Sequence, residues 1–275
     1  PDDQITIALR NDDVDTLQKI ISTNQVDLSE AVVPYNIYDS FEINNSPSYI
    51  NYAAICGSLK CFKYLILNHA NIDNNSFSSA VFGGNIEIVK ILDQQINEIF
   101  SKNKDRKPSR QVKNAPRQIG SSIENIIPSI KKHQNDLFDW LFEQKFTKTI
   151  QDKELTQRLL LVSSENGNPH SITTIVDKGF DFLSLDRDFC RRIIQGASKN
   201  GFYKLLQFLS IIMNMNFERD NNFGVFDYES SVYFGNLSIF KFYLQKSSSA
   251  IINNALTSAV EKECVNIVKY IFETD

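Results

Sequence analysis

The chain has 275 residues, of which 42% are apolar, so it can bury a substantial core. Its formal net charge of −4 argues against nucleic acid as the main partner. It contains no run of 18 uncharged apolar residues, so we expect no membrane span.

The cysteines bear on the cellular compartment of the chain, and the first residue bears on whether the sequence is a fragment. Cys56, Cys61, Cys190 and Cys264 form no CxxC pair and have no histidine at metal-site spacing. We therefore expect buried thiols in a reducing compartment, which favours a cytoplasmic location with the nucleus as the alternative. The chain opens on Pro1 rather than Met, as a fragment of a longer protein would.

Three segments of the chain are nearly alike. Residues 53–66 read AAICGSLKCFKYLI, residues 80–92 read AVFGGNIEIVKIL, and residues 231–243 read SVYFGNLSIFKFY. In each, a small residue precedes a glycine, and an apolar pattern of helical period follows. Self-similarity of this kind indicates a repeat array.

One residue in each unit, which we call the anchor, occupies the place of Gly57. Successive anchors are 45, 27, 49, 34, 34, 34 and 28 residues apart, and the two long intervals indicate one unit plus an insertion. The eight anchors are Asp12, Gly57, Gly84, His133, Gly167, Gly201, Gly235 and Glu263.

Residues at fixed distances from the anchors predict the structure of each unit. The residues four, five and eight positions after the anchor are mostly apolar and form one helical stripe, as in Phe62 and Leu65. The residue four positions before the anchor is always Ala or Ser, which lets helices approach closely. The frequent glycine at the anchor indicates a turn with positive φ. We therefore predict an all-α array of about eight stacked helix–turn–helix units that spans residues 1–275 as a single domain.

The pattern resembles the ankyrin-repeat family. Residues 53–73 match the family's A-A-x-x-G-x-x-x-V-V-x-x-L-L-x-x-G-A-x-I-N, and residues 175–181, IVDKGFD, match L-L-x-x-G-A-D. The family's T-P-L-H opening is missing, and SYIN at 48–51 stands in its place. The wealth of Asn, Phe and Tyr looks like the divergent ankyrin proteins of trichomonad protists. The resemblance implies an ankyrin-type solenoid with short connector loops or hairpins.

Connectors and insertions separate the units. Connectors rich in Asn, Asp and Gly are expected at 71–77, 180–189 and 217–228, and insertions at 32–48 and 101–117. Residues 101–117 carry seven basic residues and one acid, a local charge of +6. This segment is interpreted as a solvated loop dispensable for folding, with a nuclear-localisation or anionic-partner patch as alternatives. Arg106 lies three residues before Ser109, which makes Ser109 a candidate phosphorylation site.

No motif for catalysis, phosphate binding or metal binding occurs in the sequence. The histidines, His69, His133 and His170, fall at different places in different units, so they predict no shared site. We therefore expect a chain that is not an enzyme and that uses no cofactor and no metal.

The leading hypothesis is a non-catalytic scaffold that binds another protein on a concave face made by first helices and connector tips. The alternatives are an interaction module of a larger enzyme or signalling protein, and a binder of anionic partners through residues 102–117. The candidate partner-binding residues are Tyr49, Tyr52, Asp73, Asn74, Phe82, Asp186, Arg187, Arg191, Arg192, Arg219, Asp220, Tyr233 and Phe234.

Overall fold

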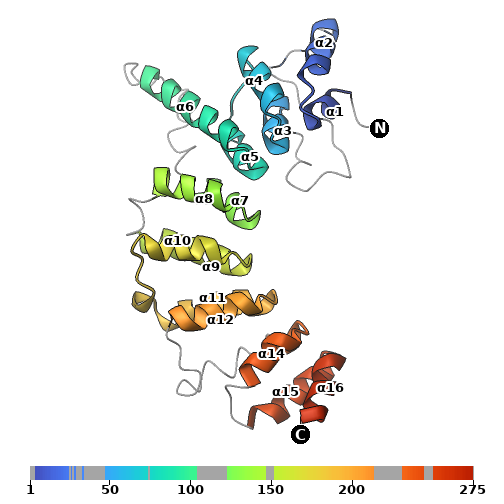
Figure 1. Ribbon diagram of the computed structural model, residues 1–275, viewed down its shortest axis with the longest axis vertical. Helices are drawn as coiled ribbons and strands as arrows, with labels where there is room; N and C mark the ends of the chain where they lie inside the picture. The colour runs from blue at the N-terminus through green and yellow to red at the C-terminus, as the bar shows by residue number, and fades with distance from the viewer. Residues whose placement is uncertain are drawn as a thin grey trace, which may run out of the picture. The chain divides into compact units, whose positions relative to one another are not determined.

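The computed structural model describes residues 4–24, 26, 28, 33, 47–73, 75–103, 123–146, 152–213, 231–244 and 250–274. Every regular element in these residues is helical, and they include no β-strand (Figure 1). The chain divides into two compact units, residues 1–145 and residues 146–275. The all-α prediction is thus confirmed for the described residues, whereas continuity of one array through both units stays a prediction.

Unit 1 contains four helical hairpins. We number them hairpins 1 to 4 in chain order and pair α1 with α2, α3 with α4, α5 with α6 and α7 with α8. The helices are α1 (Gln4–Arg10), α2 (Val14–Asn24), α3 (Tyr49–Cys56), α4 (Leu59–Leu67), α5 (Ser76–Gly83), α6 (Ile86–Asn103), η2 (Ile123–Asn125), α7 (Ile127–Lys131), α8 (Asn135–Leu141) and the π-helical turn η3 (Phe142–Phe146).

Unit 2 contains hairpins 5 to 8. Hairpin 5 is α9 (Lys153–Glu165) with α10 (Pro169–Asp177), and hairpin 6 is α11 (Arg187–Lys199) with α12 (Tyr203–Ile212). A short 3-10 helix, η5 (Phe182–Ser184), lies between them. Hairpin 7 is the helical segment 231–233 with α14 (Leu237–Leu244), and hairpin 8 is α15 (Ala250–Glu261) with α16 (Val265–Thr274).

All eight anchors adopt positive φ, between 52° and 78°. In five of the hairpins the anchor is glycine, as in Gly57, which has a φ of 70° and ends α3. Asp12, His133 and Glu263 adopt the same left-handed conformation although they carry side chains. The predicted left-handed turn between the two helices of each unit is confirmed, because this conformation lets the chain reverse within one or two residues.

The first helices of neighbouring hairpins pack on one another. In unit 1, α3 lies between α1 and α5, and α5 also packs on α7; in unit 2, α9 packs on α11 (Figure 1). The Ala or Ser four positions before the anchor is buried in all eight hairpins. Gly83 shows how close the approach is, because a Cβ added there would lie 2.0 Å from the carbonyl oxygen of Ala54.

The apolar stripe of the second helices forms the rest of the core. The residues five and eight positions after the anchor are buried, with two exceptions at the ends of the chain. Ile20 in hairpin 1 and Val268 in hairpin 8 are half-buried. Within the described residues of its own unit, hairpin 1 follows no other hairpin and hairpin 8 precedes none, so these two stripes are covered less completely.

The connectors partly follow the sequence-based expectation. Residues 76 and 77, placed in a connector, begin α5, and residues 187–189 begin α11. In the segment 32–48, Val33 is buried and its N–H donates to the carbonyl of Pro47 at 2.8 Å. The first three residues of segment 101–117 are the last turn of α6, and residues 104–117 and 217–228 lie outside the described residues. No described helix combines the length and the hydropathy that a bilayer crossing needs.

Candidate functional site

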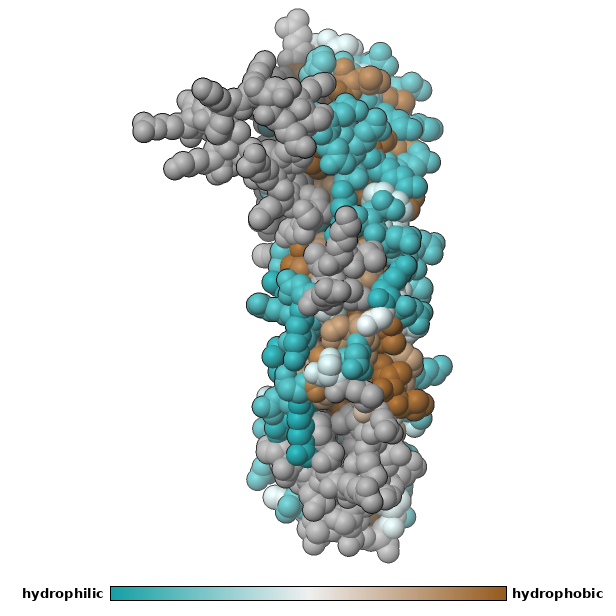
Figure 2. Space-filling model, turned by 90° about the vertical axis from the view of Figure 1, so that its left-hand side faces the viewer, coloured by the Kyte–Doolittle hydropathy of each residue, from teal (hydrophilic) through white to brown (hydrophobic). Residues whose placement is uncertain are grey.

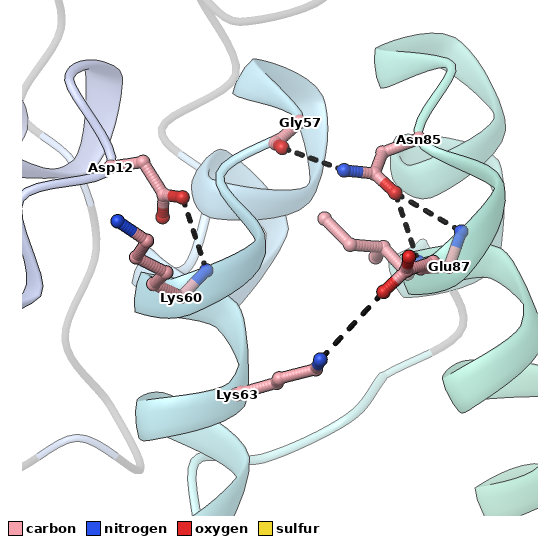
Figure 3. Close-up of polar contacts among 7 residues, drawn as sticks. Asp12, Gly57, Lys60, Lys63, Asn85 and Glu87 are labelled. Carbon is pink, nitrogen blue, oxygen red and sulfur yellow. Dashed lines mark hydrogen bonds and ion pairs between the residues drawn. The ribbon is translucent and has the colours of Figure 1, made fainter.

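Polar side chains tie the turns of hairpins 2, 3, 4, 7 and 8 to the hairpin before each. In each case the side chain of the residue after the anchor donates a hydrogen bond to a backbone carbonyl of the preceding hairpin. Asn85 Nδ2 donates to the carbonyl of Gly57 at 3.0 Å, while Asn85 Oδ1 accepts from the N–H of Glu87 at 3.0 Å (Figure 3). Asn85 therefore caps its own helix, α6, and binds the previous turn with the same amide group.

Other turns repeat this arrangement with different side chains. Gln134 Nε2 donates to the carbonyl of Phe82 at 3.2 Å, and Asn236 Nδ2 donates to that of Ser198 at 3.1 Å. The Ser58 hydroxyl donates to the carbonyl of Leu9, and the Cys264 thiol donates to that of Val232. The sequence indicates this contact, because the residues after the anchors are mostly Ser, Asn, Asp or Gln. It was not predicted, because the interpretation of the sequence used only the small and apolar positions of each unit.

Asp12 makes a related contact from the anchor itself. Its carboxylate accepts from the backbone N–H of Lys60 at 3.2 Å (Figure 3). It also accepts from the backbone N–H of Cys61 at 2.9 Å, and both donors lie in the first turn of α4. Ser58, the N-cap residue of α4, forms no capping hydrogen bond with its side chain. Hairpin 1 thus caps a helix of hairpin 2, and the Lys63–Glu87 ion pair at 3.7 Å links hairpins 2 and 3 in the same region.

The turns of unit 2 carry an exposed pair of aromatic side chains. Tyr233 and Phe234 are 58% and 43% exposed, and their ring centroids are 4.8 Å apart in an edge-to-face arrangement. Lys199 Nζ lies 5.6 Å from the Phe234 ring centroid, and Lys262 Nζ lies 4.8 Å from the Tyr233 ring centroid. We call these four residues the aromatic–lysine surface.

The polar contacts at the turns hold this surface in place. Asn236 Nδ2 also donates to the carbonyl of Lys199 at 3.3 Å, which fixes the end of α11 beside the turn of hairpin 7. On the other side, Asn266 Nδ2 donates to the carbonyl of Gly235 at 3.1 Å. Each lysine therefore reaches a ring of hairpin 7 from a neighbouring hairpin, and each cation–π contact at such an exposed site contributes about 0.5–1 kcal/mol.

The structure overturns two of the predicted aromatic anchors. Tyr49 and Tyr52 are buried in α3, between α1 and α5, so neither ring can meet a partner. The Tyr52 hydroxyl accepts a hydrogen bond from Arg10 Nε at 2.6 Å. The prediction failed because neighbouring helices cover α3 on several sides, so that all of residues 49–54 are buried.

Phe82 and Asp73 are occupied by contacts within unit 1. Phe82 is half-buried, and Lys132 Nζ lies 4.1 Å from its ring centroid. Asn51 Nδ2 donates to both carboxylate oxygens of Asp73, at 3.1 and 3.0 Å, and Asn75 N–H donates to one of them at 2.7 Å. Asp73 therefore fastens the connector to α3, and its role in partner specificity stays a prediction.

The predicted residues of hairpin 6 lie on α11 and at its start. Asp186 is exposed and caps α11 by accepting from the N–H of Phe189 at 2.8 Å. Arg187 and Arg192 are exposed, and the Arg192 guanidinium lies 5.4 Å from the Phe189 ring centroid, while Arg191 is half-buried. The remaining candidates, Asn74, Ser109, Arg219 and Asp220, lie outside the described residues.

The thiols and imidazoles do not converge on a site. All four cysteines are free, but only Cys61 is buried, so the expectation of buried thiols is wrong for the half-buried Cys56, Cys190 and Cys264. Burial, helped by the nearby Asp12 carboxylate, raises the pKa of the Cys61 thiol to about 12, which makes it a poor nucleophile.

The histidines occupy turns or helix surfaces. His69 and His133 both have positive φ, and His170 is half-buried on α10. Within the described part of the chain, no three His, Cys, Asp or Glu side chains are grouped closely enough to hold a metal ion. The aromatic–lysine surface is therefore the most distinctive exposed feature of the described residues.

No known protein-family model matches the chain, and no curated protein matches it.

Proposed function

We propose that the chain is an ankyrin-type array of helix–turn–helix repeats that acts as a non-catalytic scaffold and binds another protein. The repeat assignment is supported by the left-handed conformation of all eight anchors and by burial of the small residue four positions before each. The similarity of residues 53–73 to the ankyrin pattern is the basis for proposing that family. Repeat arrays of this kind offer extended surfaces for partners.

The observation that carries the binding function is the exposure of Tyr233 and Phe234. Two large aromatic side chains lie next to each other at a turn, and most of the Tyr233 side chain remains in water despite the lysine contacts. Tyrosine and phenylalanine are enriched at protein interfaces because they bury much area at little entropic cost. The lysines at positions 199 and 262 place positive charge at both edges of the pair, so the partner segment would combine an apolar side chain with carboxylates.

A capture experiment tests this function. The chain and its Tyr233→Ala/Phe234→Ala variant are used to capture proteins from cells that express the chain, and Ile211→Ala, at another exposed apolar position of unit 2, is the matched control. Loss of a partner from the double variant alone is the expected result, with a melting temperature lowered by no more than the roughly 3–6 °C that loss of the two cation–π contacts accounts for. A partner retained by the double variant at wild-type level would refute the assignment of this surface.

Binding of an anionic partner through residues 102–117 is the second candidate, supported by the local charge of +6 in residues 101–117. Deletion of residues 102–116 should leave the melting temperature of the chain unchanged, and a fall of many degrees would show that the segment is needed for folding. If the segment binds anions, affinity for phosphoinositide vesicles falls with added salt and disappears on deletion. A role within a larger enzyme or signalling protein is tested by the sequence of the complete gene.

A further inference from the structure

One position of the first helices faces the next hairpin within a unit. This is the residue three positions before the anchor, which we call position −3. The Ser198 hydroxyl is 2.8 Å from the Tyr243 hydroxyl of hairpin 7, and the Ser164 hydroxyl donates to the carbonyl of Ile193 in hairpin 6. In hairpins 1 to 7 the residue at position −3 is buried with no more than a trace of exposure: Leu9, Ala54, Val81, Ile130, Ser164, Ser198 and Val232.

Two positions of the second helices face the same way. At position +2, two residues after the anchor, Tyr203 contacts Phe242 of the next hairpin with ring centroids 5.9 Å apart. At position +9, Asp93 forms an ion pair with Lys145, which follows α8 of the next hairpin. Positions −3, +2 and +9 therefore lie on the side of a hairpin that faces the next one, although Pro169, at +2 of hairpin 5, is exposed.

In hairpin 8 these three positions are apolar and exposed. Val260 at position −3 is 59% exposed, Val265 at position +2 is 75% exposed, and Phe272 at position +9 is 69% exposed. They are three of the eight large apolar side chains that are exposed among the described residues. We call them the end face of hairpin 8.

Hairpin 1 carries polar residues at the positions that face a preceding hairpin elsewhere in the chain. Positions +4 and +7 of a hairpin face the preceding hairpin. At +4 of hairpin 4, Leu137 is buried, and at +7 of hairpin 8, the Tyr270 ring packs on Phe240 of hairpin 7. In hairpin 1 they hold Thr16 and Lys19, both exposed, and Thr16 hydrogen-bonds the Asp13 carboxylate at 2.7 Å. Polar outer faces of this kind are typical of capping repeats, and the end face of hairpin 8 lacks that character.

We propose that the end face of hairpin 8 binds a further helix–turn–helix of the same kind as those within the chain. The interior interfaces specify its chemistry: Ala or Ser four positions before its anchor, an apolar residue at +4 and an aromatic ring at +7. A Ser, Asn or Cys after its anchor donates to the backbone carbonyls of hairpin 8, as Cys264 does to the carbonyl of Val232. A second copy of the chain does not meet this specification through its hairpin 1, because that hairpin presents Thr16 and Lys19. The proposal rests on the packing between hairpins and not on partner binding by the aromatic–lysine surface.

A tandem variant supplies such a hairpin. It carries a second copy of residues 245–275 after Asp275, and this segment is suitable because hairpin 8 already packs beside a valine at position −3, Val232. The tandem chain should melt several degrees above the natural chain. Val260→Glu is then made in both chains, at the first copy of residue 260, with Asn254→Glu as the control at an exposed polar position of α15.

The two chains should respond differently to Val260→Glu. In the chain of residues 1–275 the substituted side chain stays in water, and the melting temperature should change by less than about 2 °C. In the tandem chain it would be buried, and the melting temperature should fall by about 4 °C or more, while Asn254→Glu is neutral in both. Val265→Glu repeats the comparison on α16.

Two results would overturn the proposal. One is an equally small effect of Val260→Glu in both chains, which would mean that the added hairpin does not cover the end face. The other is a dimer of the natural chain in sedimentation that Val260→Glu dissociates, because a second copy would then be the occupant.

Discussion

Asp12 is predicted to stabilise hairpin 2 although it belongs to hairpin 1. Its carboxylate accepts from two N–H groups in the first turn of α4, at Lys60 and Cys61. Asp12→Ala removes both acceptors and the negative charge at the helix N-terminus. Loss of a cap costs about 1 kcal/mol and loss of the charge about 0.3–1 kcal/mol, so the total is about 1–2 kcal/mol. For a unit of this size the melting temperature should fall by roughly 3–6 °C.

Two further substitutions separate capping from backbone strain. Asp12→Asn keeps one acceptor oxygen and tolerates positive φ, so it should cost about 0.5 kcal/mol. Asp12→Gly loses the cap, but relief of the left-handed conformation, with φ of 52°, recovers part of that loss. The expected order of stability is wild type, Asn, Gly and then Ala.

Amide hydrogen exchange supplies the local measurement. Asp12→Ala should speed exchange at the amides of Lys60 and Cys61 relative to the rest of α4. Asp13→Ala is the matched control, because Asp13 accepts from the N–H of Thr16 at 3.0 Å within hairpin 1 and should affect only α2. Unchanged exchange at Lys60 and Cys61 in Asp12→Ala, together with an unchanged melting temperature, would refute a cap supplied by the neighbouring hairpin.

Three other predictions concern the core. Leu65→Ala and Leu206→Ala should each cost about 2–5 kcal/mol in urea unfolding, because both side chains are fully buried, whereas Leu67→Ala, 77% exposed on the same helix as Leu65, should cost almost nothing. Gly83→Ala should cost about 1–3 kcal/mol, because its Cβ would collide with the carbonyl of Ala54 and force α3 and α5 apart; a variant as stable as wild type would contradict the close approach. For Cys61 the folded pKa of about 12 exceeds the ordinary value of about 9, so between these pH values the folded chain keeps a proton that the unfolded chain loses. Stability should therefore fall more steeply above pH 9 in the natural chain than in Cys61→Ala, and parallel curves would contradict the raised pKa.

The periodic part of the fold could be predicted from the sequence. The fixed spacing between the small residue, the anchor and the apolar stripe predicted the position of all eight turns. These include the turns at Asp12, His133 and Glu263, where the anchor is not glycine. This succeeded because each hairpin depends on its own residues and its immediate neighbours, so local pattern and tertiary contacts agree.

The candidate surface could be predicted only in part. Tyr233 and Phe234 were identified, but Tyr49 and Tyr52 were assigned to the same surface and are buried. Periodicity identifies which residues share a helix face, but the exposure of that face depends on how many neighbours cover it. The lysines at 199 and 262 were missed because they reach the rings from other hairpins, 35 and 29 positions away along the chain.

The sequence by itself thus determined the helical repeat, the position of each left-handed turn and most of the core, because these follow from residue type at fixed spacing. Only the tertiary structure decided which side chains are shared between hairpins. Asp12 caps the helix of a neighbour, Asn236 fastens α11 to the next turn, and Val260 is exposed where its seven counterparts are buried. These outcomes depend on contacts across hairpins, where the energy of a polar or apolar group is set by what lies opposite it.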